Sequence, residues 1–314
     1  MRLEVHVGQA ADVTDKGGSM SRLALAAVAS AMMITGALSE EGARAYFLLP
    51  EDTNIISLTG TLLHLEVGGN TFGAATVTPS YRRSIEVGGN AGAILIGIPV
   101  GSLSASVDMG AGIVELDTDI AQGDLFVGAE LGLIGSPSLA PMDYAQYKPG
   151  FRAGIAAKLF LPTGDYDSSR LLNLGGNRWS LQASLPLSYV LAENMIDPEL
   201  TTFELVPSVQ IFGDNDDPVT VASQKPLWRL EGHITRSFGP TIWASLDGSY
   251  AYGGETSADG VSYGSAQQTL SLGATLGLVL NPTVALRLSY LEQVYSSTPD
   301  TAARGFELNT SFRF

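Results

Sequence analysis

The chain has 314 residues, of which 45% are apolar and 16% charged, with a net charge of −15 and no cysteine. The lack of cysteine excludes disulfides, thiol catalysis and cysteine-based metal sites. The acidic balance argues against a nucleic-acid partner, because phosphate neutralisation needs clustered Lys and Arg. We expect no cofactor.

The first 45 residues are predicted to be a leader. Arg22 precedes an uncharged run from Leu23 to Leu38, and Ala43-Arg44-Ala45 is an A-x-A cleavage pattern. These features indicate a secretory signal peptide over residues 20–45, so that the mature chain, residues 46–314, would begin at Tyr46. The polar residues 1–19 are interpreted as a mis-assigned start or a disordered extension.

After the leader, segments of about ten or more residues alternate between apolar and polar side chains. Strand side chains point to opposite faces in turn, so each segment has one apolar and one polar face. A soluble antiparallel sheet gives the same local pattern. Its strands usually have about five or six residues, however, whereas a tilted membrane-spanning strand needs about 9–11. The lengths therefore favour a membrane.

Turns rich in Gly, Pro, Asn and Asp divide the chain into twelve predicted strands. Their approximate bounds are 53–67, 71–87, 90–100, 124–134, 150–161, 177–191, 200–212, 226–238, 241–252, 266–280, 283–294 and 305–314. The predicted fold class is all-β, a transmembrane antiparallel up-and-down β-barrel in the bacterial outer membrane. Pro79 and Pro99 interrupt the first three strands, so ten or fourteen strands remain alternatives.

Several motifs carry a resemblance to a known family. They are the run KLFLPTGDYDSSRLLNLGGNRW from Lys158 to Trp179, LWRLEGH from Leu227 to His233, WASLD from Trp243 to Asp247 and YGGET from Tyr252 to Thr256. With them the chain resembles, from about Tyr81 to Phe314, the family labelled putative MetA-pathway of phenol degradation. The resemblance implies an outer-membrane barrel of the transporter or porin type, linked in some members to the breakdown of aromatic compounds. It implies no catalytic residues.

The phase of the alternation predicts which charged side chains face the barrel interior. They are Arg152, Lys158, Glu204, Arg229, Glu231, His233, Asp247, Arg287, Glu307 and Arg313. Charges of both signs either pair across neighbouring strands or line a water-filled channel. We expect a narrow or partly occluded channel. Arg229 and Glu231 share a face, so an ion-pair ladder with Asp247 is favoured over a substrate site.

Enzyme activity is not expected. The predicted mature chain has two histidines, His64 and His233, and no serine motif like that of the barrel phospholipases. Asp214, Asp216 and Asp217 could supply oxygen ligands to Ca²⁺. They lack the spacing and closing glutamate of an EF-hand, so a solvated polar loop is the favoured interpretation.

Two functions stay open. The first is passive or facilitated uptake of small, aromatic or apolar molecules across the outer membrane. The second is a closed structural barrel whose extracellular loops bind a partner or surface. The expected partners are outer-membrane lipid and lipopolysaccharide, a small-molecule substrate, and the barrel-assembly machinery, which would read Phe314 as the terminal aromatic.

Overall fold

The computed structural model describes residues 41–108, 112–217, 223–258, 261–262 and 266–314. The predicted extension 1–19 and residues 20–40 of the predicted signal peptide lie outside these ranges. The described residues are mostly in strands, and the short helix α2 (Pro141–Gln146) lies between two consecutive strands. No helix in the described part of the chain is long and apolar enough to cross a membrane.

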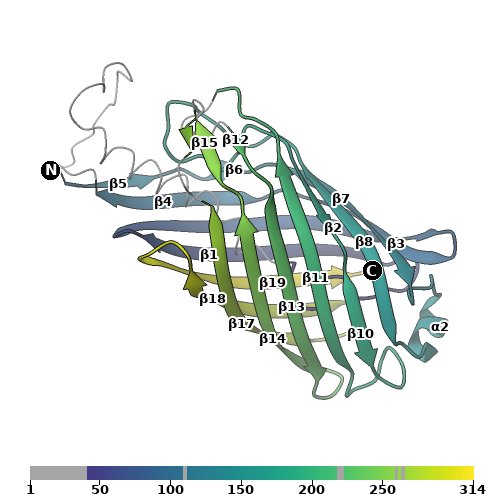
Figure 1. The fold of residues 1–314 in the computed structure, drawn as a ribbon. Coiled ribbons are helices and arrows are strands. Elements are labelled where there is room, and N and C mark those ends of the chain that lie inside the picture. Colours follow the sequence, from purple (N-terminus) through teal and green to yellow (C-terminus); the bar gives the residue numbers. More distant parts are fainter. Residues whose placement is uncertain (1–40, 109–111, 218–222, 259–260, 263–265) are drawn as a thin grey trace.

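The strands form one antiparallel sheet that closes into a barrel (Figure 1), because β1 pairs with both β2 and β19. Some barrel strands consist of two or three consecutive labelled segments. In order around the barrel they are β1 (Asn54–Val67), β2 (Asn70–Val87), β3 (Asn90–Gly97) with β4 (Val100–Asp108), β5 (Ile113–Asp117) with β6 (Ala121–Gln122) and β7 (Phe126–Ile134), β8 (Phe151–Phe160), β9 (Ser180–Ser184) with β10 (Leu187–Leu191), β11 (Thr201–Phe212), β13 (Leu227–Ser237), β14 (Ile242–Gly253), β17 (Gln267–Val279), β18 (Val284–Ser296) and β19 (Thr301–Arg313). The predicted closed barrel of twelve strands is confirmed.

The two ends of the barrel differ. At one end, called here the terminal end, Asn54 and Phe314 exchange two backbone hydrogen bonds of 3.0 Å, and α2 lies nearby (Figure 1). The other end, the loop end, carries the longer connections and a separate sheet of β12 (Ser223–Gln224), β15 (Thr256–Ala258) and β16 (Val261–Ser262). At this end Gly68 and Gly69 both have positive φ, which a two-residue hairpin turn requires.

The outward face of the barrel is apolar. Leu246 is 70% exposed and Leu62 62%, and they belong to a continuous belt of aliphatic and aromatic residues. Members of this belt from strands all around the barrel are Leu58, Val77, Ile94, Ile155, Leu205, Leu230, Ile234, Leu272, Leu276, Leu288, Phe306 and Leu308. Such a belt would be unstable in water and is what a lipid bilayer requires of a barrel.

One predicted region was wrong. The predicted bounds make residues 101–123 a connection, yet the structure forms β4, β5 and β6 there. Pro99 does not end the strand, because the flanking groups still bond: Ile98 donates to the Pro79 carbonyl (3.2 Å) and Gly123 to the Pro99 carbonyl (2.8 Å). The β4–β5 hairpin reaches past neighbouring strands at the loop end (Figure 1).

Candidate functional site: the barrel lumen

The inward face of the barrel is polar. On β13 the residues alternate strictly between buried and outward-facing positions, with Arg229, Glu231 and His233 all at most 6% exposed. The neighbouring strands continue this surface with Ser245, Asp247, Ser249, Thr269, Ser271 and Thr275. Polar side chains buried in this way need hydrogen-bonding or ionic partners.

Some of these hydrogen-bonding and ionic partners come from a segment that precedes β1. Residues 41–53, called here the N-terminal segment, enter the lumen from the terminal end and contact several walls of the barrel. Glu41 lies deepest, where Lys158 Nζ of β8 donates to both carboxylate oxygens at 2.6 and 2.7 Å. Its backbone N–H donates to Glu231 Oε2 of β13 at 3.1 Å, and its carbonyl accepts from Arg287 of β18 at 3.4 Å. The segment therefore occludes part of the lumen.

Arg44 anchors the same segment. Its backbone N–H donates to Glu204 Oε2 (2.9 Å) and its Nε donates to the Thr235 hydroxyl (2.9 Å). The guanidinium also stacks over the Trp243 ring at 4.5 Å, a cation–π contact. Ala43, which lies between Glu41 and Arg44 in the sequence, is only 1% exposed.

Other charges pair within the wall. Arg82 lies 2.6 Å from Glu130, and Arg287 lies 2.7 Å from Glu307. The predicted ladder of Arg229, Glu231 and Asp247 is only partly right. Arg229 lies 3.9 Å from Glu231, but Asp247 pairs with His233 at 2.8 Å, because the register of β13 and β14 places these two opposite each other.

The structure places nine of the ten predicted lumen residues on the interior surface. The tenth, Arg313, has the inward phase but lies exposed at the terminal end. Sequence reasoning missed Arg82 and Glu130, which lie on the early strands whose facing was ambiguous. It also missed Glu41 and Arg44, which were expected to be removed with the leader.

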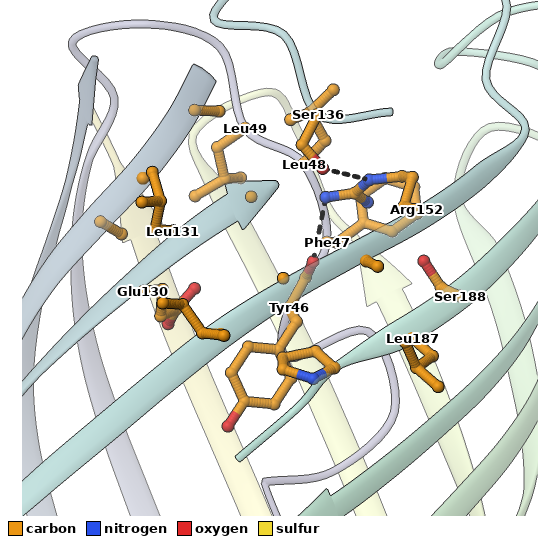
Figure 2. Close-up of a pocket in the computed structure, with 18 of the residues that line it drawn as sticks. Tyr46, Phe47, Leu48, Leu49, Glu130, Leu131, Ser136, Arg152, Leu187 and Ser188 are labelled. Carbon is orange, nitrogen blue, oxygen red and sulfur yellow. Dashed lines mark hydrogen bonds between the residues drawn. The ribbon is translucent and has the colours of Figure 1, made fainter. Parts of the chain in front are cut away.

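A cavity remains between the N-terminal segment and the wall in the terminal half of the barrel. It encloses about 740 Å³ of space free of atoms, including the part open to solvent. Figure 2 shows Arg152 in this cavity, donating to the Ser136 hydroxyl and to the Tyr46 carbonyl, each at 3.3 Å. The lining combines these polar groups with apolar side chains, among them Phe47, Leu48, Val190 and Val206.

At the loop end, the family motif between Lys158 and Trp179 has a structural role. Asp124 accepts backbone hydrogen bonds from Gly164 and Gly176, each 2.9 Å, which hold the long connection 161–179 against the barrel. A Cβ on Gly164 would lie 2.7 Å from backbone atoms of Gly123 and Gly175, so the close approach requires glycine. Burial lowers the pKa of Arg178 to about 10, opposed by the carboxylates of Asp214 and Asp124.

The calcium candidates do not form a site. Among the described residues, no group of three or more His, Asp or Glu side chains could hold a metal ion, and Asp214, Asp216 and Asp217 are included in that search. The order in this loop comes instead from Asn215, which is 6% exposed. Its side chain bonds Asn177 at 2.8 Å and the Tyr166 hydroxyl at 3.0 Å.

A closed barrel with an apolar belt outside and charged, hydrogen-bonded groups inside defines the class of bacterial outer-membrane β-barrels. The location predicted from the sequence is thereby confirmed. A family model described as "Putative MetA-pathway of phenol degradation" matches residues 52–314. The chain belongs to this family, as the motifs indicated.

Solved structures of outer-membrane barrels share the fold. The COG4313 outer membrane channel from Pseudomonas putida F1 is 19% identical with a TM-score of 0.71, and the alignment covers 88% of this chain and 100% of that one. The beta domain of the Bordetella autotransporter BrkA is 12% identical with a TM-score of 0.50, covering 84% of this chain and 100% of that one. No curated protein sequence matches the chain.

Proposed function

We propose that the protein is an outer-membrane channel through which small, aromatic or apolar molecules enter the cell. The observation that carries this proposal is the lumen: it is lined by charged groups of both signs and keeps a cavity, partly open to solvent, beside the N-terminal segment. A barrel that served only as a closed scaffold would gain stability by filling this space with packed side chains.

The type of solute follows from the lining. Leu48, Val190 and Val206 offer apolar contact, while Arg82 and Arg152 offer guanidinium groups to a polar or anionic substituent. A small aromatic molecule with one polar group satisfies both kinds of surface. The family description, which refers to phenol degradation, supports the same class.

Single-channel conductance tests the proposal. The protein is purified from outer membranes, so that its natural processing is kept, and is placed in a planar bilayer with phenol, benzoate or toluene in the bath. We expect a small, steady conductance that an aromatic solute reduces and that glucose at equal concentration leaves unchanged. A folded barrel that is silent here and in liposome uptake would refute transport through the lumen.

The alternative is a closed barrel that binds a partner through its external loops. It is favoured by one observation, the occupation of the middle of the lumen by Glu41 and Arg44. Deletion of the loop 253–265 separates the two functions, because it should abolish partner binding but leave uptake unchanged. Under either function we propose that the loop end contacts lipopolysaccharide and that the barrel-assembly machinery recognises Phe314.

A further inference from the structure

The residues that the A-x-A pattern assigns to the leader make specific contacts inside the barrel. Glu41 forms an ion pair with Lys158, and the backbone of Glu41 and Ala43 accepts hydrogen bonds from Arg287 at 3.4 and 3.3 Å. Side-chain exposure in the ion pair is 22% for Lys158 and 15% for Glu41, so solvent cannot replace the partner fully. These contacts involve β8 and β18, which lie far apart around the sheet.

Arg44 adds contacts on a third part of the wall. It engages Glu204 through its backbone and Thr235 and Ser237 through its guanidinium. The negative side chain of Glu41 thus lies against the Lys158 ammonium, and the positive side chain of Arg44 lies against two hydroxyl groups that accept its hydrogen bonds. A segment that is cut off and discarded has no physical reason to match the interior of the mature barrel in this way.

Cleavage after Ala45 would leave uncompensated charge in the lumen. Lys158 would lose its carboxylate partner, and Glu204 would lose the Arg44 N–H. The new ammonium of Tyr46 would also form where Arg82 now donates to the Ala45 carbonyl (2.7 Å) and Arg152 to the Tyr46 carbonyl (3.3 Å). Two guanidinium groups, of which Arg82 already pairs with Glu130 at 2.6 Å, would then face a third positive charge, an arrangement that is costly away from bulk water.

We propose that the signal peptide is removed at the Ser39–Glu40 bond, so that Glu41–Ala45 stay on the mature chain as the innermost part of the N-terminal segment. Hydrolysis of this bond by water leaves a carboxylate on Ser39 and an ammonium on Glu40. Ala37 and Ser39 supply the small residues that the peptidase needs at the third and first positions before the cut. The apolar run Leu23–Ile34 before them has the usual length of a signal-peptide core.

Intact mass measurement of the protein purified from outer membranes tests this assignment directly. We expect the mass of residues 40–314. A mass matching 46–314, or any other start after Glu41, would overturn the retention of the segment, and a start at Glu41 or before Glu40 would overturn the choice of bond. The result does not depend on whether the barrel transports anything.

A pair of variants provides a second readout that is independent of folding, because the peptidase acts before the barrel assembles. Ser39→Phe and Ala45→Phe each place the same bulky ring directly before one of the two bonds. We expect Ser39→Phe to accumulate unprocessed precursor in a pulse-chase experiment, and Ala45→Phe to be processed at the normal rate. The reverse pattern would place the cut after Ala45 and overturn the proposal.

Discussion

Leu276 on β17 faces outward near the middle of the apolar belt, so its replacement by arginine measures the cost of placing a charge in lipid. The outward residues from Leu270 on this strand to Leu280, which directly follows it, are all apolar. At roughly 3.4 Å per residue and a tilt of about 40°, the ten steps between them rise about 26 Å, which matches an apolar band of about 25 Å.

The same geometry supplies a matched control. Leu276 lies within about one step, roughly 3 Å, of the middle of this band, whereas Leu280 lies about 13 Å from it on the same face. A basic residue costs about 2–4 kcal/mol at the midplane and about 0–1 kcal/mol near the interface. We therefore expect Leu276→Arg to lower the free energy of unfolding by about 2–4 kcal/mol and Leu280→Arg by at most about 1 kcal/mol.

Reversible guanidinium unfolding in phospholipid vesicles, followed by tryptophan fluorescence, gives both values. Equal losses at the two positions would refute the assignment of the belt, because they would mean that depth along β17 does not matter. Thr275, the inward neighbour, is not a suitable control. It is 4% exposed and donates to Asp247 at 2.6 Å, so its replacement disturbs the lumen wall as well.

Three further predictions concern packing, assembly and the lumen. Gly277→Ala should lower the free energy of unfolding by about 1–3 kcal/mol through overpacking, because a Cβ there would lie 1.9 Å from the Trp243 ring. Gly248→Ala should be nearly neutral, because its Cβ would lie 3.5 Å from Leu272. Similar unfolding free energies for the two variants would contradict this prediction. Phe314→Ala should slow insertion in a pulse-chase experiment more than Phe312→Ala, and equal rates would show that the terminal aromatic is not read. Glu41→Gln and Lys158→Met should show a coupling energy of about 1.5–3 kcal/mol in a double-mutant cycle of thermal unfolding, and additive losses would mean that the two side chains do not meet.

The number of strands and their facing could be predicted because both depend on local pattern. In β13 a single residue lies between Arg229 and Glu231, and another between Glu231 and His233. This period of two is visible in the sequence without any structure. The same holds for β19, where Phe306 and Leu308 face outward and Glu307 lies between them. Prediction failed where the pattern fades. In β4 small residues such as Gly101, Ser102 and Ser104 occupy both faces, so the alternation does not continue past the predicted strand 90–100.

The contacts of the N-terminal segment could not be predicted, because no local sequence pattern indicates them. Glu41 and Lys158 are 117 residues apart, and Arg44 and Thr235 are 191 apart. The segment also lies directly after an apolar run, so the pattern of a signal peptide masks it. The contacts of the segment depend on the closed barrel, which places β8, β11, β13 and β18 around it.

The size of the barrel explains why such a segment is needed. About eight strands enclose a space that wall side chains alone can fill, and the diameter grows roughly linearly with strand number. Twelve strands leave a central space. Lys158 and Glu204 both face this space, but they lie at different heights, because Lys158 is opposite Gln182 and Glu204 is opposite Ser188 on the one barrel strand between them. Glu41 and Arg44, three residues apart on a segment that turns between Gly42 and Phe47, reach both residues: the Glu41 carboxylate pairs with Lys158, and the Arg44 backbone N–H donates to Glu204. If residues 41–45 are retained, as we propose, the N-terminal segment supplies a carboxylate and a backbone donor to the charged wall, and the cavity beside it is the space that the proposed channel offers to a solute.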